Sequence, residues 1–533
     1  MSRIERARAR ALQPQLLLVT ALTLVGLAIR VAEFGQSLWA DELSTVWILE
    51  GNGLGDVLSS VHSTDEITPP LYFVLAWASL QVGPDPEWAR LPSLLAGSTT
   101  IPLVYMLGLR TVGSRAGLVG AAVLALSPFM IHYSVEARAY ALMIALLTAS
   151  TLFLLSAPED RRARSWTLYA LCSCGALLSH YTSVFPLAAQ FAWALWAHRE
   201  AAKPLLLANL GVLAGFAPWI PGFIADNDSP TTQILSVLQP FTFDAVRFAI
   251  EQWAVGYPYV RLESVPGWTA GVLLAAGLGV ALVAGALRAF AWQRRIRPSL
   301  TEALRRVPPR LVLVVALALA APVGEAIYSA LGTNLLGARN LNASWPGLAL
   351  SMGALAAAAG PLLGAVSAAL LIAGFAVGAS LTLDSERARI DYAAAANAIE
   401  RRWNPGDVVV DSASLTPVPL TGLDVYLPQT NPEFRLGLPA SDEPFMVADP
   451  VPPPDRLIAA AIGSARGGAI FLVTHGDLSA TTGYVANLLK QRKRLGKLLL
   501  RRARYDFEVT YRRTLPGLAP LVIFEMEDRA ASR

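Results

Sequence analysis

Apolar runs close to the length of a membrane-spanning helix recur along the first 384 residues. A helix needs about 20 mostly apolar residues to cross a bilayer. Eleven such runs lie at 13–31, 91–109, 116–133, 139–156, 166–180, 183–197, 204–223, 267–287, 311–331, 342–358 and 361–381. A further apolar run, 69–83, is short, and we expect an interfacial or re-entrant helix there. The pattern predicts a polytopic α-helical membrane protein with about eleven transmembrane helices.

Positive charges gather between alternate pairs of these runs. They lie at the N-terminus, at Arg110 and Arg115, and within 159–165, 198–203 and 294–310. Lys and Arg favour the cytoplasmic side of a membrane. With a cytoplasmic N-terminus, eleven crossings put every basic cluster inside and leave residues 31–90 as a long external loop. We therefore predict a multi-pass protein of the inner (plasma) membrane.

The pattern changes after residue 384. From 385 to 533 the helix-like stretch "ARIDYAAAANAIERRW" is followed by four strand-like ones, "GDVVVDSAS", "GGAIFLVTHGD", "YDFEVTYRRT" and "LAPLVIFEMED". Mixed helices and strands of this kind are typical of a small soluble α/β domain. We divide the chain into a transmembrane domain, 1–384 with its external loop 31–90, and an extracytoplasmic α/β domain, 385–533.

Composition agrees with a membrane location. The chain is 54% hydrophobic and 15% charged, with a mean hydropathy of +0.46, whereas soluble proteins carry about 25% charged residues. Its two cysteines, Cys172 and Cys174, lie in an apolar run and are interpreted as packing residues. The sequence has no Walker motif and no Gly-rich Rossmann turn, and we expect no nucleic-acid partner.

Ionisable and aromatic residues gather at the predicted outer ends of the spans. Asp41 and Glu42 follow the first span in "SLWADELSTVW". The others are Tyr133, Glu136 and Arg138 after the third span, His180 after the fifth, Arg339 after the ninth, and Glu325 within the ninth. Ionisable groups at membrane depth are rare, so their shared side indicates a functional site.

Taken singly, each residue also has a structural interpretation. The acidic pair after the first span would cap an interfacial helix. Glu136 and Arg138 would neutralise each other, and Arg339 would extend to the headgroups. His180 would pack with a hydrogen bond, and Glu325 would pair inside the bundle. Both interpretations stay open at this point.

An acidic external loop beside arginines fits the transfer of a sugar from a lipid phosphate. Guanidinium groups hold the phosphate leaving group and stabilise its developing charge. The acceptor hydroxyl needs a base, and a carboxylate can serve; partial desolvation at headgroup depth would raise the pKa of such a carboxylate and strengthen it in that role. A single base with a cationic phosphate site implies direct displacement and inversion. The candidates for donor and phosphate binding are Arg138, Arg339, Tyr133 and His180, with Glu136 and Glu325 as supporting acidic residues.

The chain resembles the membrane-embedded C-superfamily glycosyltransferases of the family 39 type, which include protein O-mannosyltransferases and bacterial lipid A aminoarabinose transferases. The resemblance is close over about 30–150 and looser over the remaining membrane region. It rests on "SLWADELSTVW", "TPPLYFVLAW", "EWARLPSLLAGSTTIPLVYMLGLR", "LALSPFMIHYSVEARAYAL" and "GARNLNASWPGLAL".

This resemblance implies a polyprenyl-phosphate-linked sugar donor, catalysis on the outer face and an acidic base in the first external loop. By position the base falls on Asp41, with Glu42 in support. The second acidic position falls on Glu136 and the phosphate-binding arginine on Arg339. The expected partners are the lipid-linked donor, an acceptor glycan, lipid or protein, and membrane lipids.

Two positions depart from the family pattern. Thr68 precedes the Pro-Pro pair where relatives often have His or a basic residue, and Asn340 follows Arg339 where relatives often have Tyr. Some relatives use a divalent metal, and two neighbouring carboxylates with Glu136 would suit one. Because arginines serve the phosphate, we expect no cofactor, and a divalent cation remains the alternative.

Two other functions stay open. The first is a flippase or transporter for lipid-linked sugars, and the second is a non-catalytic relative that acts as a cell-envelope assembly module. A transporter needs a polar path through the bundle, whereas the polar span residues gather externally and no inverted repeat is visible. The pattern therefore favours the glycosyltransferase.

Overall fold

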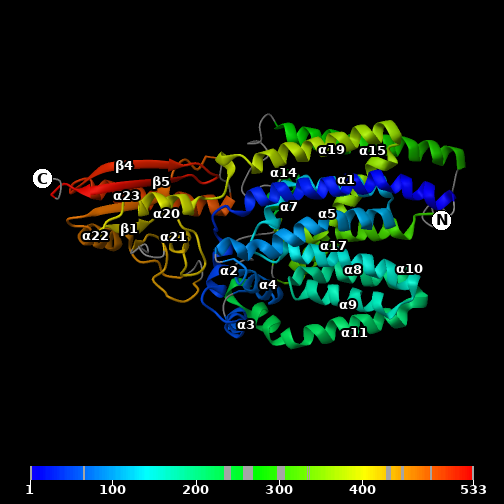
Figure 1. Ribbon diagram of the computed structural model, residues 1–533, viewed down its shortest axis with the longest axis horizontal. Coiled ribbons are helices and arrows are strands. Elements are labelled where there is room, and N and C mark those ends of the chain that lie inside the picture. The colour runs from blue at the N-terminus through cyan, green and yellow to red at the C-terminus, as the bar shows by residue number, and fades with distance from the viewer. Residues whose placement is uncertain are drawn as a thin grey trace.

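The computed structural model describes residues 3–63, 66–83, 85–232, 242–255, 268–296, 306–332, 334, 337–427, 434–445, 449–479 and 483–530. Figure 1 shows an elongated molecule in which a bundle of long helices adjoins a smaller region of strands and helices. Helix α1 begins at the end of the bundle that is remote from the strands (Figure 1).

Helices cover all the predicted spans. The bundle contains α1 (Arg3–Phe34), α5 (Leu91–Thr111), α6 (Ser114–Leu126), α7 (Pro128–Ser134), α8 (Tyr140–Asp160), α9 (Ala163–Leu177), α10 (Val184–Ala197), α11 (Ala202–Phe216), α12 (Ile220–Asp228), α14 (Phe243–Val255), α15 (Thr269–Ile296), α17 (Pro309–Leu331), α18 (Trp345–Ala358) and α19 (Pro361–Thr382). Among the described residues, seven helices are long and apolar enough to cross a membrane, or up to eight if the bent α6–α7 pair is one span. Helices α9, α10 and α18 have only 15, 14 and 14 residues. The multi-pass helical fold is confirmed, and the count of eleven is not.

The sequence explains the break between α6 and α7. Pro128 has no amide hydrogen to continue α6, and the two helices meet at 62°. The Ser127 hydroxyl accepts a hydrogen bond from the Met130 amide and caps α7. At Gly97 in α5, an added Cβ would lie 2.0 Å from Ser134 Oγ. The missing side chain thus lets the end of α7 approach α5, and this fixes the turn that follows α7.

Basic residues from separate loops meet at the end of the bundle where α1 begins. Arg310 Nη2 lies 2.6 Å from Glu159 Oε1, and Arg310 Nη1 donates to the Arg110 carbonyl at 3.0 Å. Arg110 also pairs with Glu159. The basic loops at 110, 159 and 310 therefore share one end of the bundle, as the predicted topology requires. The side of the membrane to which this end belongs stays a prediction.

The segment predicted as the first external loop, 31–90, forms short helices at the opposite end of the bundle (Figure 1). They are α2 (Asp41–Leu49), α3 (Leu54–Ser63), α4 (Leu71–Leu80) and the 3-10 helix η1 (Pro86–Arg90). Helix α4 is apolar but has ten residues, too few to cross a bilayer. The short helix predicted within 69–83 is therefore present, and its interfacial or re-entrant position stays a prediction.

The C-terminal region is a five-stranded sheet with the order β2-β1-β3-β5-β4. Its strands are β1 (Val408–Asp411), β2 (Phe434–Arg435), β3 (Ala469–His475), β4 (Phe507–Leu515) and β5 (Leu521–Asp528), accompanied by helices α20 (Tyr392–Glu400), α21 (Gly422–Tyr426), α22 (Pro454–Ser464) and α23 (Gly483–Ala503). β1 runs parallel to β2 and β3, whereas β5 is antiparallel to β3 and β4. All four predicted strands are present. The two-residue β2 was missed because so short a strand carries no periodic pattern.

Candidate active site

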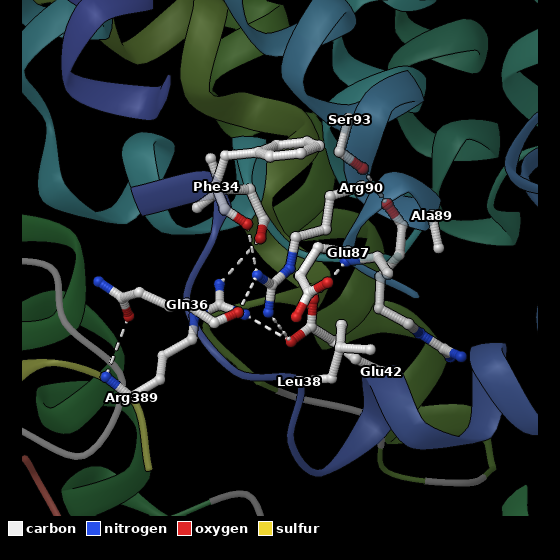
Figure 2. Close-up of polar contacts among 12 residues, drawn as sticks. Phe34, Gln36, Leu38, Glu42, Glu87, Ala89, Arg90, Ser93 and Arg389 are labelled. Atoms are coloured by element: carbon white, nitrogen blue, oxygen red, sulfur yellow. Dashed lines mark hydrogen bonds and ion pairs between the residues drawn. The ribbon is translucent and has the colours of Figure 1, made fainter. Parts of the chain in front are cut away.

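Glu42 is the centre of a buried ion cluster at the bundle end that faces the sheet. Arg90 Nε and Nη2 lie 2.7 Å from its Oε1 and Oε2, respectively (Figure 2). Arg389 Nη1 lies 2.6 Å from Oε2, and the Ala137 amide donates to Oε1 at 2.8 Å. Burial opposes the ionisation of Glu42, but Arg389 and Arg90 outweigh it and hold its pKa below the ordinary value. A buried charge persists only when it is paired in this way.

Arg90 joins this cluster to the end of the first span. Its guanidinium group donates to the carbonyl of Phe34 at 2.7 Å, to that of Ser37 at 3.1 Å and also to that of Gln36. These carbonyls lie at or just beyond the end of α1, where helical carbonyls lack internal partners. Figure 2 shows the guanidinium group between Phe34 and Glu42. Arg90 therefore fixes the chain that leads into α2.

Asp41, the residue before Glu42, has a different environment. Its side chain is 34% exposed and forms an ion pair with Arg339, whose side chain is 29% exposed. Burial opposes the ionisation of Asp41, but Arg339 and Arg138 outweigh it and hold its pKa below the ordinary value. The expectation that desolvation raises this pKa is therefore wrong, because the guanidinium groups dominate.

The backbone before Asp41 is strained. Ala40 has φ 49° and ψ −122°, a conformation that residues with a side chain rarely adopt. Such strain persists where the surroundings fix the chain, often at functional sites. Ala40 is also the N-cap of α2, and no side chain caps this helix. Asp41 and Glu42 lie in the first turn of α2, where the helix dipole favours carboxylates, but neither caps the helix with a hydrogen bond.

Glu136 lies in the turn between α7 and α8. It is buried, and within the described part of the chain its Oε2 has no hydrogen-bond partner. Burial raises its pKa to about 7, the charges of Asp41 and Glu42 add to the rise, and Arg389 and Arg339 oppose it. Near neutral pH this carboxyl group is therefore divided between its neutral and charged forms.

Arg138 does not neutralise Glu136, as one interpretation of the sequence expected. Its Nη1 and Nη2 instead lie 2.6 and 2.9 Å from the two carboxylate oxygens of Glu66. Nη2 also donates to Thr68 Oγ1 at 2.9 Å. Thr68 is the residue that departs from the family pattern, so here it helps to hold an arginine.

The remaining candidates lie in two places. Tyr133, Tyr140 and His180 form an aromatic row, with ring centroids 5.0 Å apart for the first pair and 5.2 Å for the second. His180 also interacts electrostatically with Arg138 and Arg339, so this row lies beside the arginines. Glu325 is buried inside α17, and its Oε2 has no partner among the described residues. The expected ion pair of Glu325 is therefore not seen in the described part of the chain.

Three residues of the site were not assigned a role from the sequence. Arg90 was noticeable as a lone basic residue in an acidic loop, and Glu66 was one of several acids there. Arg389 lies 347 residues from its partner Glu42, so no local pattern connects the two.

The acidic residues of this site do not fit a metal ion. Among the described residues, no group of three or more His, Cys, Asp or Glu side chains is placed to hold one. Both oxygens of Glu42 are bonded to arginines and an amide, and Asp41 is paired with Arg339. Guanidinium groups thus bond to the carboxylate oxygens that would otherwise be available to a cation.

Comparison with known proteins reveals similarity in sequence and in fold. Residues 68–221 match the family model of dolichyl-phosphate-mannose-protein mannosyltransferase. The structure resembles ArnT from Cupriavidus metallidurans in the apo state, with a TM-score of 0.51 and 15% identity over 96% of this chain and 98% of that chain. The same protein bound to undecaprenyl phosphate gives a TM-score of 0.50 and 13% identity, with the same coverage of both chains. No curated protein matches the sequence.

Proposed function

Because the chain has the architecture of the C-superfamily membrane glycosyltransferases, we propose that it transfers a sugar from a polyprenyl-phosphate-linked donor to an acceptor hydroxyl. One observation carries the proposal: a partly exposed Asp41–Arg339 pair lies beside the buried, unpartnered carboxyl oxygen of Glu136. In this arrangement Arg339 can bind the donor phosphate, and Asp41 or Glu136 can accept the proton of the acceptor hydroxyl. Undecaprenyl phosphate, bound in the ArnT structure, is a lipid phosphate of the proposed class.

The phosphate site of the proposal is Arg339. Its guanidinium group is partly exposed and is paired with a carboxylate, and a phosphate bonds to a guanidinium group in the same forked geometry as a carboxylate does. Bonding to the phosphate stabilises the negative charge that develops as the sugar leaves. Arg138 is already held by Glu66 and Thr68, so it contributes charge to the site without changing partners.

The base of the proposal is Asp41. When Arg339 turns to the donor phosphate, Asp41 loses its counter-ion, its pKa rises and it becomes able to accept the hydroxyl proton. The acceptor oxygen then bonds to the anomeric carbon while the bond from that carbon to the phosphate oxygen breaks. A direct displacement of this kind inverts the anomeric centre. Glu136 is the second candidate, favoured by its unpartnered oxygen and its pKa of about 7.

We place the reaction on the outer face of the membrane. The carboxylates Asp41 and Glu42 begin α2, at one end of the bundle (Figure 1), whereas Arg310 lies at the start of α17, where it bonds to the Arg110 carbonyl at the other end. Lys and Arg favour the cytoplasmic side, which supports an external position for the site. The donor would then be a lipid-linked sugar present in the outer leaflet.

The test is transfer by the full-length protein in proteoliposomes supplied with a panel of polyprenyl-phosphate sugars and hydroxyl acceptors. We expect the release of polyprenyl phosphate by the wild type and its loss in Asp41→Asn with folding retained. Near-normal turnover of that variant would move the base to another residue. Movement of labelled donor across the bilayer without an acceptor would support the transporter instead. Glycan and glycoprotein profiles of a strain that lacks the gene would identify the sugar.

A further inference from the structure

Arg389 lies in the C-terminal region but bonds to residues of the membrane region. It follows α19 and the 3-10 helix η8 (Ser385–Arg387), and its side chain is almost fully buried. Besides the ion pair with Glu42, its Nη2 donates to the carbonyls of Val135 and His132 at 3.2 and 3.4 Å. Its own amide donates to Gln36 Oε1 at 3.1 Å (Figure 2). One residue thus contacts three segments.

These contacts hold the turn that carries Glu136 from both sides. Arg389 binds the carbonyls of His132 and Val135 at the end of α7, where a positive charge is favoured, and the His132 carbonyl also accepts from the Val135 amide. Glu42, the ion-pair partner of Arg389, accepts from the Ala137 amide at 2.8 Å. Residues 135 and 137 are therefore tied to the two members of one buried ion pair, and Glu136 lies between them.

Further contacts tie the C-terminal region to the residues before Asp41. Ser37 Oγ donates to Asp391 Oδ1 at 3.1 Å. The Leu38 amide donates to the Tyr426 hydroxyl at 2.9 Å, and that hydroxyl donates to Glu87 Oε1 at 2.6 Å. The segment that leads into the strained Ala40 turn is thus held from outside the membrane bundle.

We propose that Arg389 is a positioning residue of the active site, which sets the Glu136 turn against the start of α2. The C-terminal region is then part of the catalytic unit and not an appended module. The inference rests on the proposed transfer reaction, and it gives the C-terminal region a specific role in that reaction.

The chemistry of the side chain explains why an arginine is needed. Its planar fork bonds to a carboxylate and to two carbonyls in fixed directions, which a lysine ammonium does not reproduce. Arg389→Lys keeps the charge and loses the fork, whereas Arg389→Gln loses both. A displacement of about 1 Å in a catalytic group costs roughly 10²-fold in rate. We therefore expect kcat to fall about that much in R389Q and less in R389K, with donor KM little changed.

The matched control is Arg402→Gln. Arg402 pairs with Glu525 and its guanidinium carbon lies 4.2 Å from the centre of the Tyr511 ring, so it too is an ion-paired arginine of the C-terminal region. These partners all lie within the C-terminal region. R402Q should therefore keep wild-type kcat and donor KM, which separates positioning from a general loss of stability in the C-terminal region.

The experiment compares the four full-length proteins in nanodiscs by steady-state transfer and by amide hydrogen exchange. We expect R389Q to lose kcat at constant KM, R389K to recover part of it, and exchange over 132–138 to quicken while exchange in β3 is unchanged. Wild-type kcat and wild-type exchange in R389Q would overturn the inference and leave the proposed function intact. If R389Q does not fold, R389K decides by the same two measurements. A wild type that is inactive with every donor would refute the proposed function, whereas the exchange measurement still reports on Arg389.

Discussion

Asp41 and Glu42 are neighbours in sequence with the same functional group, but the structure places them in opposite environments. Glu42 is fully buried and shared by Arg90 and Arg389. Asp41 is one-third exposed and paired with Arg339, which is also partly exposed. The bonds of Glu42 hold segments of the protein together, whereas the pair of Asp41 opens towards the surface. A ligand with a phosphate group can therefore reach Asp41 and Arg339 but not the Glu42 cluster.

This difference shows that the free-energy cost of ionising a carboxyl group depends on its charged partners more than on its burial. Both carboxylates have a lowered pKa because guanidinium groups outweigh burial. Glu136, which is buried with an unpartnered oxygen, has a raised pKa of about 7. The pKa of Glu136 thus shifts in the opposite direction to those of Asp41 and Glu42, because at Glu136 burial outweighs the charges of the arginines.

The largest expected effect comes from exchanging the two neighbours for their amides. Glu42→Gln leaves two buried guanidinium groups without their counter-ion and should destabilise the protein by about 3–5 kcal/mol. Asp41→Asn removes a partly exposed pair and should cost less than about 1 kcal/mol, while turnover falls by about 10²–10⁴-fold. Thermal unfolding in detergent and turnover in proteoliposomes measure the two effects. Equal melting temperatures for the two variants would contradict the inference that Glu42 stabilises the fold more than Asp41 does.

A substitution of Arg339 tests the partly exposed Asp41–Arg339 pair. Arg339→Ala removes the proposed phosphate contact and should lower kcat/KM for the donor by about 10²–10³-fold. Arg310→Ala is the control, because Arg310 is an exposed, ion-paired arginine at the opposite end of the bundle. Initial rates at varied donor concentration give the comparison. Similar losses in both variants would show a general effect of arginine removal and would not support a phosphate site.

The predicted pH dependence concerns Glu136, whose pKa is raised to about 7 by burial and by Asp41 and Glu42. A carboxyl group with a raised pKa binds its proton more tightly in the folded state. The stability that it contributes is therefore full below its ordinary pKa and is lost as pH rises through about 7. Glu136→Gln should remove this decline, so that its melting temperature rises relative to that of the wild type as the pH increases from about 4.5 to about 7, and the difference stays constant at higher pH. Parallel melting curves for the two proteins across pH 5–9 would contradict the assignment.

Much of the fold was predictable because it follows from local patterns. Apolar runs near bilayer length marked the helices of the bundle, and short strand-like stretches marked β1, β3, β4 and β5. The number of crossings was harder, since α9, α10 and α18 are short helices whose passage through a membrane is not decided by length and composition. The strand β2 has two residues and left no pattern to detect.

The candidate site was predictable as a list of residues but not as a set of pairs. The sequence placed Asp41, Glu136 and Arg339 on one side, and the structure gathers them at one end of the bundle. It could not show that Arg138 bonds to Glu66, because the two residues lie 72 positions apart and Glu136 is the nearer carboxylate in the sequence. It also gave no reason to join Arg389 to Glu42, since pairs so distant in sequence depend on the tertiary fold.

The smallest expected effect is that of a chelator. Arginines neutralise both Asp41 and Glu42, and no described group of three or more acidic, His or Cys side chains is placed to hold a cation. Transfer by protein washed with EDTA should therefore keep its rate, and added Mg²⁺ or Mn²⁺ should not raise it. The measurement is the initial rate of polyprenyl phosphate release before and after chelation, with a metal-dependent glycosyltransferase as the positive control. A loss of activity that Mn²⁺ reverses would mean that donor binding separates Asp41 from Arg339 and lets Asp41 bind a metal ion. The two neighbouring acids would then differ in the cation that they bind, with Glu42 still paired with arginines.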